Sequence, residues 1–447
     1  MIVQNWWFTT LLERQYNVCP PLQSDIKCDV LIIGGGMSGV SAAAAFIGKG
    51  LKVVILEKNI LGGSSSGRSA GFLTPDSELE LSQLVRRFGV PGANTIWEIP
   101  VKGIGSIKDN VEKYNIQCDF RTQDSLFLGI GKGGWKDVND EMECREKLGF
   151  KNQNLYNKTE LDKILNSEGF TGAVRYSDTY GIDALQYLQG LKTVLLEDGI
   201  KVFESTQVLK IEGRTAYTHA GSVTADQIVV AIDKMKPRFN KVADEVFHAQ
   251  TFLSVSEPLS NKEVQQLFPG GQDFQMWDST VVYSYWRLIA GNRILLGGGS
   301  ALTTFLPKAW YHENIINGVH KRFKNHFPFL KDLEFIQYWP GLIDTTRDLL
   351  PVVVRDEDNP NIHFILGVVG LPWASFCGNF VAKNILKTAT DDDDRYFKYL
   401  SDRRYFALPS SLYKFISKPV LFALNNGWAK YYQKDQNHKI KKKIGEF

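Results

Sequence analysis

The sequence lacks any unbroken apolar run of about 18 residues, the length that a membrane-spanning helix requires. It also lacks a basic leader followed by an apolar core, because Glu13 and Arg14 come soon after the short stretch Met1 to Phe8. Excess charge of one sign is absent as well, since the formal net charge is only +3 over 447 residues. We therefore expect a cytoplasmic protein with no nucleic-acid partner.

Cysteine is sparse. The five cysteines are scattered, and no two of them have CxxC or zinc-ligand spacing. The sequence thus predicts neither a disulfide framework nor a metal site, which is typical of a reducing compartment. The composition is otherwise that of a globular protein, with 43% hydrophobic and 23% charged residues. Its length predicts about two or three lobes, because single cores stop growing at about 250–300 residues.

The residues from Cys28 to Glu57 have the order strand, glycine loop, helix, strand. The runs 29–33 and 52–56 predict two buried parallel strands, because both are short and continuously apolar. The alanine-rich stretch 40–50 predicts a helix that Gly50 ends as a C-cap residue. This order is typical of the βαβ unit that binds a dinucleotide.

Three glycines give this loop its chemistry. Gly34, Gly36 and Gly39 form G-x-G-x-x-G, which allows a tight turn, a close approach of the backbone to a pyrophosphate, and close packing of helix on strand. The following helix would direct its positive end at the phosphates. Glu57 lies eighteen residues after Gly39, where a carboxylate can accept hydrogen bonds from ribose hydroxyls. The pattern predicts a dinucleotide site and leaves FAD and NAD open.

The rest of the chain predicts a second, antiparallel part between parallel strands at both ends. The small-residue stretch 61–71 could follow a large flat ligand or could be a flexible surface loop. The region 252–299 is rich in aromatic and β-branched residues and predicts an antiparallel sheet with a turn at Gly291-Asn292. Further strands are expected at 200–204, 208–212 and 216–219 (antiparallel), 227–231 and 362–366 (buried), with helices at 184–197, 310–327 and 374–386.

Six segments, in order, give the chain a resemblance to a known family. They are DVLIIGGGMSG with Glu57, the S-G-R-x-x-G segment 66–71, the segments 180–183, 199–202 and 207–211 taken together, 285–298, 338–351, and 364–370. The sequence resembles the glycine/D-amino-acid oxidase (DAO) superfamily of FAD-dependent oxidoreductases, in particular its gamma-glutamylputrescine oxidase-like branch. The resemblance covers most of the chain, from about residue 29 to residue 386.

The resemblance implies FAD as the cofactor, bound without a covalent link because no Cys or His lies at 62–71 or 341–351. It implies that a small amine or amino acid gives a hydride from the carbon bearing nitrogen to flavin N5. Water then hydrolyses the resulting imine, and oxygen or another acceptor takes the electrons. The residues implied to contact FAD are Gly34, Gly36, Met37, Ser38, Gly39, Glu57, Lys58, Ser65, Ser66, Gly67, Arg68, Ala70, Gly71, Val208, Ala231, Gly341, Arg347, Gly370, Leu371 and Trp373.

Several side chains are candidates for the substrate cavity, and each has a plainer alternative. They are Tyr283, Tyr285, Arg287, Trp339, Arg347 and Trp373. Arg287 could pair with a substrate carboxylate or be an exposed strand arginine. The two tyrosines should share one face of their strand, which could be ordinary core, and the tryptophans could be core as well. Arg347 could face the flavin or cap a turn. His363 is expected to be a satisfied buried histidine, and no catalytic base is assigned.

The predicted fold class is α/β with mixed α+β character. We expect a Rossmann-like FAD-binding domain made of discontinuous segments, an inserted antiparallel-sheet substrate domain, and a C-terminal helical extension. The expected boundaries are 1–27 for an N-terminal arm, 28–90, 151–240 and 335–390 for the FAD-binding domain, 91–150 and 241–334 for the substrate domain, and 391–447 for the extension with its basic tail.

Two features leave other functions open. The amphipathic, aromatic stretch 396–432 could lie on a membrane surface or could pack on the protein's own body or an oligomer partner. Leu371-Pro372-Trp373 follows Gly370, where many relatives have a polar or basic residue and another glycine. The alternatives are therefore a FAD-binding protein that acts on a larger substrate, such as tRNA or a protein, and a non-catalytic flavoprotein scaffold.

Overall fold

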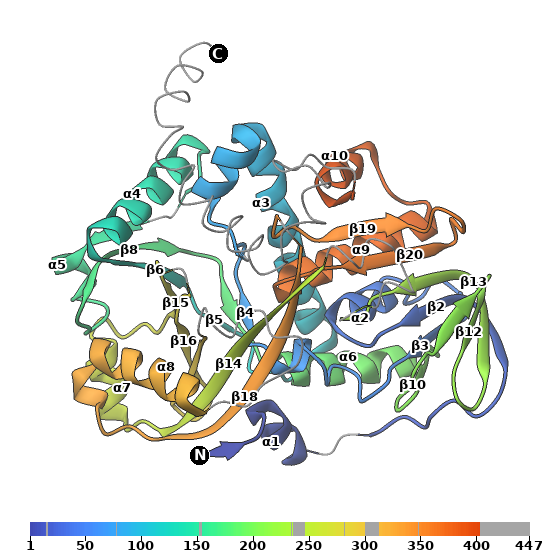
Figure 1. The fold of residues 1–447 in the computed structure, drawn as a ribbon, viewed down its shortest axis with the longest axis horizontal. Helices are drawn as coiled ribbons and strands as arrows, with labels where there is room; N and C mark the ends of the chain where they lie inside the picture. The colour runs from blue at the N-terminus through green and yellow to red at the C-terminus, as the bar shows by residue number, and fades with distance from the viewer. Residues whose placement is uncertain are drawn as a thin grey trace, which may run out of the picture.

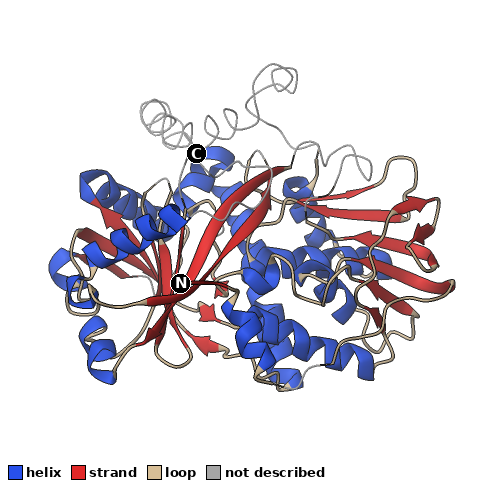
Figure 2. Ribbon diagram, turned by 60° about the horizontal axis from the view of Figure 1, so that its bottom comes forward, coloured by secondary structure: helices blue, strands red, loops and turns tan. Residues whose placement is uncertain are grey.

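The computed structural model describes residues 1–14, 17–76, 78–151, 154–233, 235, 246–280, 282–299, 313–346 and 348–402. In this part of the chain, most strands belong to two large sheets that lie side by side with helices around them (Figure 1). Figure 2 shows the strands as two groups, with helices between and outside them. The mixed α/β fold class expected from the sequence is confirmed.

The first sheet contains the expected βαβ unit. β2 (Ile26–Ile33) leads through α2 (Met37–Ala44) to β3 (Val53–Leu56), and the two strands pair in parallel. Alternate residues of β2 enter two different cores, one on each face of the sheet, which is why the strand is continuously apolar. The full order is β10 (Lys201–Phe203), β3, β2, β13 (Ser222–Val230), β12 (Thr215–Tyr217) and β11 (Lys210–Glu212), with β20 (Ile362–Leu366) paired to both β13 and β19 (Val352–Arg355).

Two local predictions in this sheet are wrong. α2 ends at Ala44, so Gly50 does not cap it and instead has φ +69 in the loop that leads to β3. β10 pairs in parallel with β3, because it follows α6 (Ala184–Glu197) and returns to the edge of the same sheet as a crossover strand. β11 and β12 do pair antiparallel, as expected.

Helices α2 and α9 (Leu371–Leu386) pack backbone to backbone over the first sheet (Figure 1). A Cβ atom on Gly378 would lie 2.1 Å from the Ser38 carbonyl oxygen, so only glycine allows this approach. α3 (Leu81–Tyr114) approaches the start of α9 equally closely, since a Cβ on Gly103 would lie 1.9 Å from the Pro372 carbonyl oxygen. These contacts fix the position of the first turn of α9.

The second sheet is largely antiparallel, as expected for residues 252–299. β16 (Tyr285–Ile289) and β17 (Arg293–Gly298) form a hairpin, and Gly291 and Asn292 in its turn have φ +73 and +55. The full order is β1 (Ile2–Val3), β18 (Phe335–Thr345), β14 (Phe247–Pro258), β17, β16, β15 (Gln275–Asp278), β6 (Ser125–Ile130), β8 (Phe170–Tyr176) and β7 (Asn154–Asn157).

The strands of the two sheets do not follow the domain boundaries that the sequence predicts. β7, β8 and β18 all pair within the second sheet, although the sequence grouped 151–240 and 335–390 with the FAD-binding segments. β18 pairs along its length with β14, which lies about a hundred residues earlier, and this long-range pairing has no local signal. The chain therefore passes between the two sheets more often than the sequence predicts.

The remaining elements connect and cover the sheets. They are α1 (Trp6–Leu12), η1 (Ser66–Arg68), β4 (Phe72–Leu73), β5 (Arg121–Thr122), α4 (Gly131–Lys147), α5 (Lys158–Leu161), β9 (Tyr180–Gly181), α7 (Asn261–Leu267), α8 (Glu313–His326), η3 (Pro328–Leu330) and α10 (Asp391–Leu400). Residues 403–447, with the basic tail and most of 396–432, lie outside the described residues. No helix in the described ranges is both long enough and apolar enough to cross a bilayer.

Candidate active site

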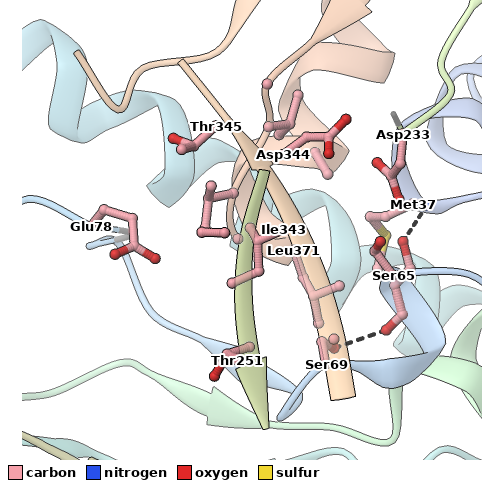
Figure 3. Close-up of a pocket in the computed structure, with 18 of the residues that line it drawn as sticks. Met37, Ser65, Ser69, Glu78, Asp233, Thr251, Ile343, Asp344, Thr345 and Leu371 are labelled. Atoms are coloured by element: carbon pink, nitrogen blue, oxygen red, sulfur yellow. Dashed lines mark hydrogen bonds between the residues drawn. The ribbon is translucent and has the colours of Figure 1, made fainter. Parts of the chain in front are cut away.

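One cavity of about 820 Å³ is lined by residues from both large sheets. Its lining runs from the glycine loop at Gly34, through η1 and the start of α9, to β14 and β18 and to the segment 74–80. Figure 3 shows Glu78 and Thr251 at one side of the cavity and Met37, Ser65 and Asp233 at the other, with Ile343 and Leu371 between them. The cavity therefore has one end at the glycine loop and another end lined by acidic and hydroxyl side chains.

The glycine loop forms the floor of one end. Gly34 has φ +107, and a Cβ there would lie 2.3 Å from the Ala231 carbonyl oxygen. A Cβ on Gly39 would lie 2.0 Å from the Gly34 carbonyl oxygen, so Gly39 packs helix on strand and does not line the cavity. Gly36 is the N-cap residue of α2 and does line it. The first-turn amides of α2 thus begin at the cavity wall, where an anion can bind.

Glu57 lies at the end of β3 in the wall of the same end. Its side chain is buried, and its two oxygens accept hydrogen bonds from the backbone N–H groups of Gly35 and Asn59, each at 2.8 Å. Burial raises the pKa of the Glu57 carboxyl, while these two N–H groups oppose the shift. The carboxylate is therefore held in one orientation with further acceptor capacity for hydroxyl groups.

Four consecutive backbone carbonyls, those of residues 67–70, are held by side chains from distant parts of the chain. The donors are Asn5 Nδ2 to Gly67 (2.7 Å), Trp339 Nε1 to Arg68 (3.0 Å), Trp7 Nε1 to Ser69 (2.8 Å) and Arg287 Nε to Ala70 (2.8 Å). None of these four donors lines the cavity. They fix the backbone of η1 and of the residues after it from behind, so this wall is rigid before any ligand arrives.

Arg287 is consequently not a substrate-cavity residue, and that prediction is corrected. It is fully buried, and its Nη2 donates to the Ile182 carbonyl oxygen at 2.7 Å in addition to the Ala70 bond. Burial lowers the pKa of the guanidinium to about 10. Trp339 and Trp373 are buried in hydrophobic cores and do not line the cavity either. Arg347 lies outside the described residues.

Tyr283 and Tyr285 share one face, as the alternation predicted, and both line the cavity. Their ring centroids are 5.7 Å apart. The Tyr285 hydroxyl lies 3.0 Å from Thr251 Oγ1, which is also 3.2 Å from the Gly298 carbonyl oxygen, and burial raises the pKa of Tyr285 to about 12. His363, by contrast, is buried in the first sheet and bonds Gln227 at 3.0 Å, as expected for a structural histidine.

Three carboxylic acids in the cavity were missed from the sequence: Asp76, Glu78 and Glu80. Burial raises the pKa of Asp76 and of Glu78 to about 7, and it raises the pKa of Glu80 well above its usual range. The Tyr283 hydroxyl donates to Glu78 at 3.2 Å. The signal was present as D-x-E-x-E shortly after the S-G-R-x-x-G segment, since alternate acids in an extended segment can face one way.

Most of the residues expected to contact the cofactor lie in the cavity wall. They are Gly34, Gly36, Met37, Ser38, Glu57, Lys58, Ser65, Ser66, Arg68, Ala70, Gly71, Val208, Ala231, Gly341, Gly370 and Leu371. Gly67 is behind the wall, where a Cβ would lie 2.3 Å from the Gly62 carbonyl oxygen. α9 begins at Leu371, three residues before the predicted helix, so Leu371 and Pro372 form its first turn in the wall.

Comparison with known proteins identifies the family. Residues 29–383 match the family model described as FAD dependent oxidoreductase (DAO). The chain belongs to the DAO family of FAD-dependent oxidoreductases. The family expected from the sequence is thereby confirmed, FAD is the cofactor, and the protein is an oxidoreductase of a family that acts on amines or amino acids.

Individual relatives agree with this assignment. The chain is 27% identical over 388 residues to the probable oxidoreductase OrdL of Haemophilus influenzae, covering 84% of this chain and 86% of that protein. It is 26% identical over 391 residues to gamma-glutamylputrescine oxidoreductase of Escherichia coli, covering 86% and 88%. The crystal structure of glycine oxidase from Geobacillus kaustophilus has the same fold, with a TM-score of 0.72 and 18% identity over 85% of this chain and 99% of that one.

The geometry of this cavity fits FAD. At Gly36 a Cβ would meet only Ser66 Oγ, at 3.3 Å, so the loop leaves a cradle next to the start of α2. The Ser66 hydroxyl already accepts from the Met37 N–H at 3.0 Å, which ties η1 to the loop. Thr345 Oγ1, also in the wall, is buried and has no hydrogen-bond partner among the described residues. A polar ligand in the cavity would satisfy it.

Proposed function

We propose that this DAO-family protein oxidises the C–N bond of a small amine or amino acid. The observation that carries the proposal is the continuity of one cavity, which runs from the glycine loop at Gly34 to the hydroxyls of Tyr283 and Tyr285. A substrate bound at the tyrosine end would lie in the same enclosed space as a cofactor bound at the glycine end. This arrangement allows direct transfer of a hydride between them.

In this proposal the glycine loop and the N-terminus of α2 bind the pyrophosphate, Glu57 accepts hydrogen bonds from ribose, and Val208 contacts the adenine. Residues 65–71 and the start of α9 enclose the flavin. When bound, FAD supplies the hydride acceptor at flavin N5, and water hydrolyses the imine product. We expect a non-covalent complex, which is supported by the lining itself: none of its described residues is Cys or His.

The protein's own residues would bind and orient the substrate and exclude water. Ile343 and Leu371 form an apolar passage between the two ends (Figure 3). The Tyr285 hydroxyl stays protonated at neutral pH, because burial raises its pKa to about 12, and Thr251 holds it in place. Leu371 and Pro372 have no polar side-chain atoms, so a polar contact from either of these residues would come from the backbone of α9.

The alternatives have less support. A tRNA substrate would bring phosphates to a cavity that Asp76, Glu78 and Glu80 line, and like charges repel. A non-catalytic scaffold would need no enclosed passage from the cofactor end to buried tyrosines. Nothing in the described residues favours either of them.

The visible spectrum of the purified protein tests the proposal. Anaerobic addition of small amines and amino acids should bleach the flavin absorbance, and readmitted oxygen or an artificial acceptor should restore it. Alcohols of the same carbon skeleton, which lack the C–N bond, are the matched controls and should leave the spectrum unchanged. Failure of every amine and amino acid to reduce the flavin would overturn the proposal.

A further inference from the structure

The acidic end of the cavity carries more acidic than basic side chains. We name this end the acidic chamber and define it by Asp76, Glu78, Glu80, Tyr283 and Thr345, all of which line the cavity. At its rim α4 adds Asp137 and Asp140, of which Asp140 is paired with Lys136, and α3 adds Arg86. A ligand that enters the chamber therefore meets an excess of carboxyl groups.

One buried cation close to the chamber pairs mainly with an acid outside the cavity lining. Arg145 of α4 is buried behind it, and its Nε donates to Glu141 Oε1 at 2.8 Å. The guanidinium also lies 3.5 Å from the centroid of the Tyr176 ring. Arg145 thus pairs with Glu141, which is not in the cavity lining, and its charge also attracts the nearby Asp76 and Glu80. No cation of the described residues acts on Glu78 in this way.

The chamber acids differ in how far the protein satisfies them. Glu80 is fixed, because Tyr176 donates to one oxygen at 2.6 Å and Trp277 Nε1 donates to the other at 2.8 Å. Among the described residues, Glu78 has only the Tyr283 hydroxyl as a hydrogen-bond donor, which lies at 3.2 and 3.3 Å from its two oxygens. A buried carboxylate with so few hydrogen-bond donors costs free energy unless a ligand supplies further donors or a positive charge.

A second observation points to a ligand at this place. Thr345 lines the cavity and is 2% exposed, and its Oγ1 atom has no hydrogen-bond partner among the described residues. Figure 3 shows Thr345 on the same side of β14 and β18 as Glu78. Both groups can accept a hydrogen bond, and an ammonium group has three N–H donors to give.

A metal ion is the less suitable occupant. Among the described residues, no group of three or more His, Cys, Asp and Glu side chains is arranged so that it could hold a metal. A carboxylate anion is unsuitable too, because Arg287, the arginine expected to bind it, is buried against backbone carbonyls. An organic cation, which needs only separated acceptors and aromatic walls, fits the chamber better.

We propose that the acidic chamber selects an amine that carries a second positive charge, and that Glu78 receives the distal ammonium group. This inference rests on the proposed function, because the reacting amine must reach the cofactor end while the distal group stays at Glu78. It names the substrate class as diamines and related organic dications, and it excludes amino acids with a distal carboxylate. Glu78 is then the specificity-determining residue.

Three probes with the same carbon chain and the same reacting amine test it: cadaverine, n-pentylamine and δ-aminovalerate. Their distal ends are positive, neutral and negative. Binding to the FAD-loaded enzyme is measured anaerobically by titration calorimetry, with the flavin reduced beforehand so that no probe can be oxidised during the titration. Cadaverine should bind about tenfold or more tightly than n-pentylamine, and δ-aminovalerate should bind most weakly.

Two variants assign the effect to the charge of Glu78. Glu78→Gln should bring the affinity for cadaverine down to that for n-pentylamine and leave the latter unchanged. Tyr283→Phe removes the hydrogen bond to Glu78 but keeps its charge, so it should retain the preference for cadaverine. Equal binding or no binding of all three probes to the unmodified enzyme, or an equal loss for both amines in Glu78→Gln, would overturn the inference.

Failure of the proposed function would look different. If cadaverine binds with the expected dependence on Glu78 but no amine bleaches the flavin, the oxidation is wrong and the chamber still selects dications. If n-pentylamine and δ-aminovalerate bleach the flavin as well as cadaverine does, the oxidation stands and the selection by Glu78 is wrong.

Discussion

Glu78 shows how a single residue can link the cavity to the stability of the whole protein. Burial raises the pKa of its carboxyl from 4.5 to about 7, so the folded protein holds this proton at a pH where the unfolded chain has released it. The stability that this proton contributes is complete below about pH 4.5 and is lost as the pH rises to about 7. Asp76 behaves in the same way, with a pKa of about 7.

Glu78→Gln should therefore reduce the loss of stability over this pH range, because the amide has no proton to release. Urea midpoints of the flavin-free protein, measured across the window from about 4.5 to about 7, give the comparison. Glu112→Gln, on the exposed surface of α3, is the control and should keep the pH dependence of the unmodified protein. If the urea midpoint of Glu78→Gln changed with pH in the same way as that of the unmodified protein, the raised pKa of Glu78 would be contradicted.

Among the elements, the N-terminal helix α1 is unusual because it supports the cofactor wall from outside. Trp7 donates to the Ser69 carbonyl, and Asn5, the N-cap residue of α1, donates to the Gly67 carbonyl. Both are buried. The N-terminal arm expected from the sequence is thus part of the support of η1.

Trp7→Phe should weaken FAD binding while the fold persists. The smaller ring keeps most of the apolar contact, but the Ser69 carbonyl loses its donor, at a cost of about 1–3 kcal/mol that corresponds to about 5- to 140-fold in affinity. Titration of the flavin-free protein with FAD, followed by flavin fluorescence, measures this. Trp6→Phe is the matched control, because Trp6 stacks with Arg293 at 4.7 Å and should leave FAD affinity unchanged. Equal FAD affinity in both variants would refute the supporting role.

A buried ion pair joins α6, the strand end after β10, and the chain before β2. Lys192 Nζ lies 3.2 Å from Glu204 Oε1, and both side chains are at most 3% exposed. Glu204 also accepts from the N–H groups of Cys19 and Leu61, at 2.6 and 2.7 Å. Lys192 and Glu204 therefore hold together four segments that local sequence patterns treat separately, since Leu61 lies in the loop after β3.

Lys192→Met should destabilise the protein strongly, by about 3–5 kcal/mol, because it leaves the Glu204 carboxylate buried without its cation. The free energy of unfolding from denaturant titration is the measurement. Lys210→Met is the matched control: Lys210 pairs with Glu212 at 2.7 Å, but both are exposed, so little change is expected. A similar effect of the two substitutions would show that burial does not decide the strength of these pairs.

On the scale of the molecule, the cofactor site is built from parts of both sheets. The lining includes the loop after β2, η1, β14, β18 and the start of α9. A ligand that fills the cavity contacts segments that are far apart in the chain. Cofactor binding should therefore stabilise the whole fold by mass action.

Adding FAD to the flavin-free protein should raise the midpoint of thermal unfolding, with about 2.7 kcal/mol gained at a hundredfold excess over Kd. FMN is the matched control ligand, because it lacks the adenosine part that Glu57 and Val208 are proposed to bind. FMN should raise the midpoint less than FAD at equal concentration. Equal stabilisation by the two flavins would place the adenosine-binding role of those two residues in doubt.

Sequence patterns predicted the βαβ unit and its glycine loop, which lines one end of the cavity, because these signals are local. The glycine spacing from Gly34 to Gly39 and the two apolar strands that flank it lie within about thirty residues, and steric limits on the loop act over that distance. The hairpin turn at Gly291 and Asn292 was predictable for the same reason, because two adjacent residues with positive φ define it.

The fate of Arg287 was not predictable. Its type and its aromatic strand suggested a substrate contact, yet its position across from residues 70 and 182 makes it a donor to two backbone carbonyls. Unpaired carbonyls in a buried segment cost free energy, and the nearest available donor satisfies them wherever it lies in the sequence. The same reason placed Trp339 behind η1.

The sequence by itself determined the βαβ unit and the antiparallel character of the middle of the chain, because periodicity and glycine spacing act on neighbouring residues. It indicated the FAD-binding family through its resemblance over six segments. Only the tertiary structure decided that Asn5, Trp7, Arg287 and Trp339 hold one short wall, and that Glu78 meets Tyr283 across about two hundred residues. These contacts follow from the pairing of distant strands and from the need to satisfy buried polar groups. Neither of these two effects produces a periodic pattern in the sequence.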